Sequence, residues 1–176
     1  MSRAVVLVEG TSDKVAVEAL AMRRGHDLVA AGVSVVPIGG AQAVRRFVQR
    51  YGDDVRVVGL CDAGEEADFR RALDDVYVCK ADLEDELIRA VGPERVEQLL
   101  ESYGDLRPFR TLQKQSAWHG RPLAQQLRRF MGSGGRRKIR YAQFLVDALD
   151  LERVPPPLDD VVAHAIPCGT DALRRR

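Results

Sequence analysis

A run of five apolar residues at positions 4–8 ends abruptly in the polar sequence EGTSD at positions 9–13. Short, mostly β-branched apolar runs are typical of strands that are buried on both faces, as in a parallel sheet. A helical pattern with apolar positions at Val15, Val17 and Leu20 follows at once. Glu9 therefore lies at the carboxyl end of a predicted buried strand, which is where open α/β sheets bind their ligands.

Strand and helix patterns alternate through the first half of the chain. This alternation predicts an α/β fold with a mainly parallel sheet flanked by helices. The predicted strands are residues 4–8, 33–38, 55–60 and 76–79, and the predicted helices are residues 12–24, 44–51, a segment through Phe69 and Leu73, and a segment that begins near Asp82.

Beyond Gly92 the strand patterns fade and only helical patterns remain. We therefore expect an α/β core at residues 1–91 and a basic helical extension at residues 92–176, packed on or beside the core. The expected helices lie at residues 93–100, 123–130 and 139–149, with a short segment at 158–165.

The chain has 176 residues, which is enough for one well-buried core with an appendage. No apolar run approaches the roughly 20 residues that span a bilayer. The apolar run near the N-terminus is also too short for the hydrophobic region of a signal peptide. We therefore expect a cytoplasmic protein with no membrane partner. Cys61, Cys79 and Cys168 show neither CxxC nor Cys/His spacing, so reduced thiols are expected rather than a disulfide framework or a zinc site.

Acidic residues follow three of the predicted strands: Glu9, Asp62, and the group at residues 82–85. The carboxyl ends of parallel strands share one edge of a sheet, so these side chains are expected to converge. Gathered carboxylates repel one another, and a hard divalent cation is the usual reason for such a cluster. For Asp13 or Glu65 taken alone, a favourable charge at a helix N-terminus explains the acid equally well.

These residues resemble the TOPRIM domain that is shared by topoisomerases, primases and nucleases of the OLD (overcoming lysogenization defect) family. The shared features are the EGxSD string at positions 9–13, Gly39-Gly40 after the second strand, and Asp62 after the third. The ADLEDEL string at positions 81–87 and the basic GRRK string at 135–138 resemble the OLD-family version in particular. The resemblance implies a TOPRIM-like fold with nuclease or related phosphoryl-transfer activity. OLD-family proteins commonly carry an ATPase domain as well, and this chain is expected to be a stand-alone TOPRIM-like protein without one.

The resemblance also implies roles for individual residues. Glu9 and Asp13 would be metal ligands or acid/base groups, and Asp62 would be the first acid of the family's DxD pair. Glu84, with Asp82 beside it, would serve a second metal. The implied cofactor is Mg²⁺ or Mn²⁺, as one or two ions.

The chain departs from the family pattern at the second acid of the DxD pair, which falls on Gly64. Glu65 or Glu66 is the expected substitute, and we include Glu66 in the predicted metal site. Lys138 matches a family lysine that steadies the phosphate in the transition state. Taken alone, Lys138 is equally well explained as one more phosphate-binding or solvated cation.

A long unmixed run of positive charge occupies the second half of the chain. Residues 1–88 carry 11 Lys/Arg and 16 Asp/Glu, a net charge of −5, whereas residues 89–176 carry 16 and 10, a net charge of +6. No acid occurs between Asp105 and Asp147, and interleaved aromatics such as Trp118 suit base stacking. The run predicts nucleic-acid binding, and the expected contacts are Arg110, Lys114, Arg121, Arg128, Arg129, Arg136, Arg137 and Arg140.

These patterns together predict a divalent-metal-dependent nuclease that acts on nucleic acid, DNA rather than RNA, with Glu9, Asp62 and Lys138 as catalytic residues. A homodimer or a separate ATPase partner is compatible with this prediction. Gly64 keeps open a catalytically weakened module that binds nucleic acid or a partner. A receiver-like or flavodoxin-like regulatory domain is a further alternative, but it leaves the basic run unexplained.

Overall fold

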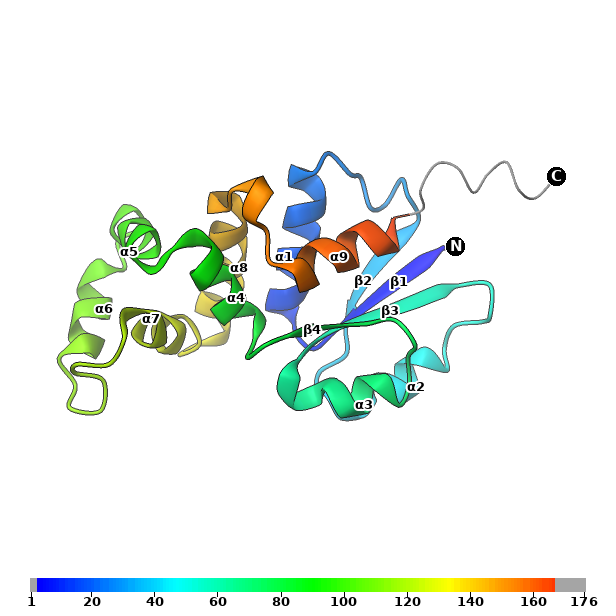
Figure 1. The fold of residues 1–176 in the computed structure, drawn as a ribbon, viewed down its shortest axis with the longest axis horizontal. Helices are drawn as coiled ribbons and strands as arrows, with labels where there is room; N and C mark the ends of the chain where they lie inside the picture. The colour runs from blue at the N-terminus through cyan, green and yellow to red at the C-terminus, as the bar shows by residue number, and fades with distance from the viewer. Residues whose placement is uncertain (1–2, 167–176) are drawn as a thin grey trace.

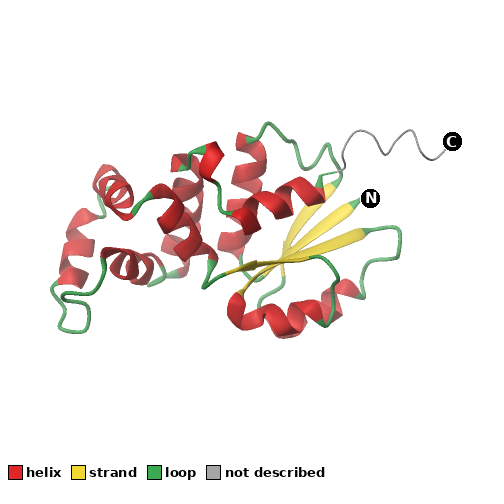
Figure 2. Cartoon of the chain, in the orientation of Figure 1, coloured by secondary structure: helices red, strands yellow, loops and turns green. Residues whose placement is uncertain are grey.

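Among the described residues, four strands form one parallel sheet in the order β2-β1-β3-β4. Figure 2 shows this sheet in yellow. The computed structural model describes residues 3–166. The chain passes from β1 to β2 on one side and then returns to add β3 and β4 on the other side. The carboxyl ends of β1 and β3 are therefore the topological switch point of the sheet, where α/β proteins form a binding crevice. The strands are β1 (Ala4–Val8), β2 (Val33–Pro37), β3 (Arg56–Asp62) and β4 (Val76–Cys79).

Helices cover both faces of this sheet, as Figure 1 shows. Every residue of β1 is buried, as predicted, and its side chains alternate between two apolar clusters. Val6 packs into the cluster that holds α1 and α9, whereas Leu7 packs with Val44 and Phe69 on the other face. The covering helices are α1 (Thr11–Arg23) and α9 (Pro156–Ala165) on one face and α2 (Val44–Val48) and α3 (Glu66–Arg70) on the other.

The remaining helices gather beyond the carboxyl ends of the strands, on the left in Figure 1. Helix α8 packs along α1, and the chain then returns so that α9 lies against β1, β3 and β4. One apolar cluster runs from β1 through α1 and α9 into these helices, so the helical part and the sheet share a core. The helices are α4 (Leu83–Val91), α5 (Pro93–Ser102), α6 (Leu106–Gln113), α7 (Leu123–Met131) and α8 (Gly135–Ala148). The described residues also form short 3-10 turns at η1 (Ala41–Ala43), η2 (Ala63–Glu65) and η3 (Leu151–Arg153).

Two elements differ from the sequence prediction. Helix α3 ends at Arg70, so Leu73 is buried from a loop that leads to β4 and not from a helix. Helix α6 was not predicted, because Pro108 breaks the local helical pattern. Proline is tolerated there because it lies in the first turn, where its missing N–H has no helical partner. Phe109, which is fully buried, ties α6 to the core.

The cysteines behave as the sequence predicts for the two that the structure describes. Cys61 and Cys79 are buried free thiols, and Cys168 lies outside the described residues. Burial, with the charges of Glu65 and Asp62, raises the pKa of Cys61 to about 12, so the thiol stays protonated at neutral pH. Within residues 3–166, no helix has the length and apolar character to cross a membrane.

The close approach of β3 to α3 gives a first prediction. A Cβ atom at Gly59 would lie 2.6 Å from Phe69 Cδ1 and 3.0 Å from Leu73 Cδ1. We expect Gly59→Ala to lower the free energy of unfolding by about 1–3 kcal/mol, measured by urea denaturation, because the core has no room for the methyl group. Gly135→Ala is the matched control, because a Cβ atom there would meet no neighbouring side chain within 4 Å. An unchanged denaturation midpoint for Gly59→Ala would contradict the packing.

Candidate metal centre and nucleic-acid interface

The register of the sheet brings the predicted acids to one edge. Val8 pairs with Leu60 across β1 and β3, and Asp62 pairs with Cys79 across β3 and β4. Glu9 therefore follows β1 directly beside the end of β3, which carries Asp62 as its last residue. The residues after β4 continue along the same edge into the first turn of α4.

Asp13 lies in the first turn of α1 and turns back toward the strand end. Its Oδ2 accepts a hydrogen bond of 2.8 Å from the Gly10 backbone N–H. Burial raises the pKa of Asp13, and among the nearby charges Lys138 lowers it while Glu9 and Asp82 raise it. Asp13 therefore joins the same acidic cluster, as its position four residues after Glu9 suggested.

Asp62 is surrounded by carboxylates from three parts of the chain. Burial, together with the charges of Asp13, Asp82, Glu84 and Glu9, raises its pKa to about 7. These four groups come from the end of β1, from α1 and from the start of α4. The structure thus gathers five of the predicted site residues around one edge of the sheet.

The two glutamates after Gly64 have different environments. Glu65 faces Glu9: burial, together with the Glu9 carboxylate as a hydrogen-bond partner and as a charge, raises the pKa of Glu65 to about 7. Its Oε2 atom is buried without a hydrogen-bond partner. Glu66 instead accepts a hydrogen bond of 2.6 Å from Arg70 Nε, one turn along α3. Of the two candidates from the sequence, Glu65 is the one that faces the acidic cluster.

Two cations from the helical part contact the acids at the start of α4. Asp82 caps α4, because its Oδ1 accepts a 2.8 Å hydrogen bond from the Asp85 N–H, and its Oδ2 accepts a 2.6 Å bond from Arg128 Nε. Glu84 is only 6% exposed and lies 3.1 Å from Lys138 Nζ. Burial lowers the pKa of Lys138, but the charges of Glu84 and Asp13 outweigh this effect, and the net pKa is raised.

The donor chemistry of the cluster fits a hard divalent cation. Carboxylate oxygens are the preferred ligands of Mg²⁺ and Mn²⁺, and the unpartnered Glu65 Oε2 atom is a buried oxygen available to such an ion. Within the part of the chain that the structure describes, however, no three His, Cys, Asp or Glu side chains are already arranged as a ligand set. Asp82 and Glu84 point to Arg128 and Lys138 instead, so ligation by all the acids requires side-chain rotation.

All the predicted nucleic-acid contacts except Arg137 are exposed, and they differ in whether an acid already pairs with them. Arg110 forms an ion pair with Glu97, Arg140 forms one with Asp105, and Arg137 donates a 2.6 Å hydrogen bond to Ser133 Oγ and lies over the Phe130 ring. These three arginines have partners within the fold. Lys114, Arg121, Arg129 and Arg136 are exposed, and Arg128 is held by Asp82.

A pocket of about 510 Å³ joins the acidic edge to the basic helices. Asp82 and Glu84 line it together with Lys138, and further lining residues come from α7 and from the loop before it. These further residues include Trp118, Arg121, Gln125, Arg128 and Arg129. A polyanion that enters the pocket meets positive charge next to the acidic cluster.

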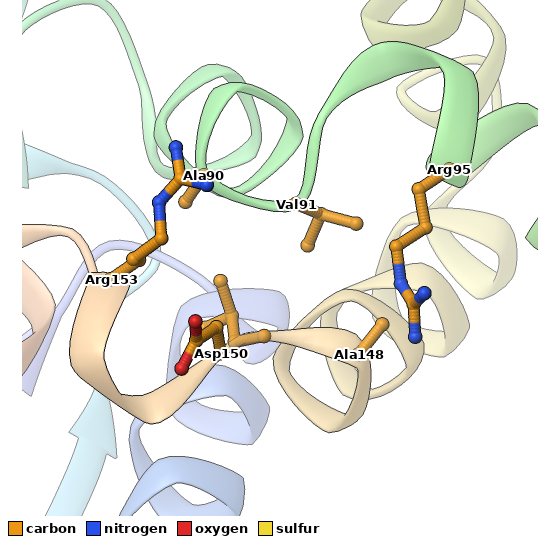
Figure 3. A pocket seen from close by; sticks show the side chains of 7 residues that line it. Ala90, Val91, Arg95, Ala148, Asp150 and Arg153 are labelled. Carbon is orange, nitrogen blue, oxygen red and sulfur yellow. The ribbon is translucent and has the colours of Figure 1, made fainter.

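A second pocket, of about 320 Å³, lies between the α4–α5 junction and the end of α8 (Figure 3). Arg95 and Arg153 flank it at opposite ends. Asp150, the single acid among its lining residues, accepts a 3.0 Å hydrogen bond from the Glu152 N–H and so caps η3. This pocket has no converging carboxylates, so it is not the candidate metal centre.

One site residue had no clear signal in the sequence. Gln126 is 6% exposed, and its side chain holds the loop that carries Trp118 through a 2.8 Å hydrogen bond to the Trp118 carbonyl oxygen. Its spacing from the buried Phe130, at i+4, puts it on the apolar face of α7. A glutamine at a core position of a helix is the only indication that the sequence offers.

Solved structures of the C-terminal regions of OLD proteins have a similar architecture. The C-terminal region of the Burkholderia pseudomallei OLD protein superposes with a TM-score of 0.70 at 16% identity, over 94% of this chain and 97% of that one. The C-terminal region of the Xanthomonas campestris pv. campestris OLD protein gives a TM-score of 0.65 at 20% identity, over 94% of this chain and 95% of that one. The chain therefore has the TOPRIM-like α/β fold with a helical C-terminal part, as predicted.

The match at the level of sequence covers a smaller part of the chain than the structural match. Residues 1–62 match the family model described as the overcoming lysogenization defect protein-like TOPRIM domain. Residues 1–62 are thus similar to an OLD-like TOPRIM domain, and the matched segment runs from β1 to the end of β3, including Glu9, Asp13 and Asp62. Comparison with curated proteins found no match.

The raised pKa of Asp62 predicts how stability depends on pH without divalent metal. The ordinary pKa of an aspartate is about 3.9, and the folded value is about 7. The native state therefore binds more protons than the unfolded state between these values, and the free energy of unfolding falls as pH rises through this window. In EDTA, we expect the free energy of unfolding of Asp62→Asn to decrease less than that of the parent between pH 5 and pH 8. The variant should therefore be more stable than the parent at pH 8.

Urea denaturation across this pH range measures the effect. The matched control is Asp53→Asn, which removes an exposed carboxylate from the loop before β3, at the other end of that strand from Asp62. Glu65 has a similarly raised pKa, so part of the slope remains in the Asp62 variant. Parallel curves for the parent and for Asp62→Asn would contradict the electrostatic description of the cluster.

Proposed function

We propose that this chain is a divalent-metal-dependent nuclease that hydrolyses phosphodiester bonds in nucleic acid, with DNA as the expected substrate and Mg²⁺ or Mn²⁺ as the cofactor. The observation that carries the proposal is the convergence of carboxylates from β1, α1 and α4 on Asp62 at the switch point of the sheet. The OLD-like TOPRIM domain supports the same class of activity.

The residues that would hold metal form two groups. Glu9, Asp13, Asp62 and Glu65 lie around the ends of β1 and β3, whereas Asp82 and Glu84 lie at the start of α4. We assign Glu65 rather than Glu66 to the first group, because Glu66 is paired with Arg70. When bound, such ions stabilise charge on the attacking and leaving oxygens and lower the pKa of a coordinated water.

Lys138 would stabilise the negative charge of the reacting phosphate. It carries its proton at neutral pH, because the carboxylates around it raise its pKa. Its contact with Glu84 holds the ammonium group at the wall of the pocket, beside the acids. A fixed cation at the place where charge develops lowers the barrier without further reorganisation.

The exposed cations around the pocket would bind the nucleic-acid backbone. Arg121 and Arg129 line the pocket directly, and Lys114 and Arg136 are exposed on the same basic part of the chain. Contacts of this kind release condensed counterions, so binding should weaken steeply with salt. Arg110 and Arg140 are assigned a lesser part, because Glu97 and Asp105 already neutralise them.

Gly64 favours a second candidate, a module that binds nucleic acid without cleaving it. Gly64 supplies no side chain at the position of the second DxD acid, and Arg128 and Lys138 neutralise two of the remaining acids. Salt-sensitive nucleic-acid binding with no cleavage in Mg²⁺, Mn²⁺ or any other divalent metal would support this candidate over the nuclease.

A cleavage assay on supercoiled plasmid and on single-stranded DNA tests the proposal. With Mn²⁺ present, we expect the parent to cut and Glu9→Gln to lower the rate at least about 100-fold, because loss of a metal ligand costs more than loss of a supporting contact. Glu18→Gln is the matched control, since Glu18 pairs with Lys14 on the exposed face of α1. A Glu9→Gln protein that cuts as fast as the parent would refute the catalytic role of this edge.

The two adjacent glutamates allow a direct test of the ligand assignment. We expect Glu65→Gln to weaken Mn²⁺ binding about tenfold or more, and Glu66→Gln to leave it unchanged. The measurement is the shift of the thermal unfolding midpoint across a Mn²⁺ titration, which reports binding to the native state without any need for turnover. Equal effects of the two substitutions would argue against Glu65 as the replacement for the missing DxD acid.

A further inference from the structure

The loop between α6 and α7 is held in one place by a buried hydrogen-bond chain. Gln126 Nε2 donates a 2.8 Å hydrogen bond to the Trp118 carbonyl oxygen, and Gln126 Oε1 accepts a 2.7 Å bond from Gln113 Nε2. Because Gln126 is almost fully buried, neither bond competes strongly with solvent. The backbone of Trp118 is therefore fixed relative to both helices.

The Trp118 side chain is only half-buried, and two guanidinium groups lie beside its ring. Arg121 lies 5.2 Å and Arg129 5.9 Å from the ring centroid. Arg121 is itself oriented by a 2.8 Å hydrogen bond from its Nε to the Ala117 carbonyl oxygen. The nearby aromatics Phe109 and Phe130 differ from Trp118, because both are buried and pack against each other in the core.

Trp118 lines the same pocket as the acids Asp82 and Glu84 and the cation Lys138. A surface aromatic ring flanked by arginines is the combination that binds single-stranded nucleic acid, because bases stack on the ring and phosphates pair with the cations. In a continuous duplex the neighbouring pairs cover both faces of each base, so the ring can stack only on an unpaired base or at a strand end.

We propose that Trp118 is a base-stacking subsite that selects substrates with unpaired nucleotides and positions the adjoining phosphate at the acidic edge. The inference rests on the proposed nucleic-acid substrate and deepens it, since it names the single-stranded form as the preferred one. Arg121 and Arg129 then bind the phosphates on either side of the stacked base.

The arginines do not prevent base stacking on the ring. A guanidinium at an exposed site is attracted to an aromatic ring more weakly than a stacked base is. Both cation distances are also long, and 5.9 Å is near the limit for such a contact. An incoming base can therefore displace a guanidinium, which keeps its charge beside the phosphate backbone.

Tryptophan fluorescence reports on this subsite directly, because Trp118 is the single tryptophan of the chain. We expect oligothymidine, added to the parent in EDTA so that no cleavage occurs, to quench the tryptophan fluorescence. Relaxed closed circular duplex DNA at the same nucleotide concentration has neither ends nor unpaired bases, and it should leave the fluorescence nearly unchanged. Oligouridine serves as the RNA arm, and quenching by either polymer supports the subsite.

Substitution provides the second readout, by anisotropy of a labelled oligothymidine. We expect Trp118→Leu to weaken binding about tenfold (~1.4 kcal/mol), and Trp118→Phe to restore most of the affinity because it keeps a stacking face. Tyr103→Leu is the matched control, an exposed aromatic that stacks on Phe144 outside the pocket. Arg129→Ala should weaken single-strand binding and reduce its salt dependence.

The outcomes separate this inference from the nuclease proposal. Equal quenching by single-stranded and duplex DNA, or Trp118→Leu binding as tight as the parent's, would overturn the subsite even if the parent cleaves DNA. Trp118-dependent binding of single strands without cleavage in any metal would support the subsite and refute the nuclease proposal.

Discussion

Repulsion among the carboxylates at the ends of β1 and β3 is the constraint around which this molecule is built. Burial and the neighbouring acids together raise the pKa of Asp62 to about 7, which means that the fold holds charge where charge is unfavourable. Two cations from the helical part reduce this cost, since Lys138 contacts Glu84 and Arg128 contacts Asp82. Hard divalent cations prefer clustered carboxylates as ligands, and this preference is the reason why the proposed function places Mg²⁺ or Mn²⁺ at this edge.

The helical part is needed for this arrangement because it supplies the cations. Lys138 lies near the start of α8, and α8 packs along α1, the helix that carries Asp13. Arg128 lies on α7, which packs against α4. The apolar contacts between these helix pairs therefore set the positions of the charges, and the shared core explains how a short four-stranded sheet supports a site that spans both parts of the chain.

Local patterns were sufficient for much of the fold. All four strands were predicted within a few residues, because short runs rich in β-branched residues between polar or glycine segments have few alternative structures. Helix α6 was missed because Pro108 obscures an eight-residue pattern, and α3 was predicted too long because Leu73 is buried from a loop. In both cases tertiary burial outweighed the local signal.

The sequence by itself determined that acids follow the strands and that cations accumulate in the second half, because both properties belong to residue order. Only the tertiary structure decided which of these charges meet. It turns Glu65 to Glu9 and Glu66 to Arg70, although the two residues are adjacent, because a helical turn points successive side chains in different directions. It likewise pairs Arg110 and Arg140 with acids while it leaves Arg121 and Arg129 at the pocket, since such pairings depend on how distant helices pack.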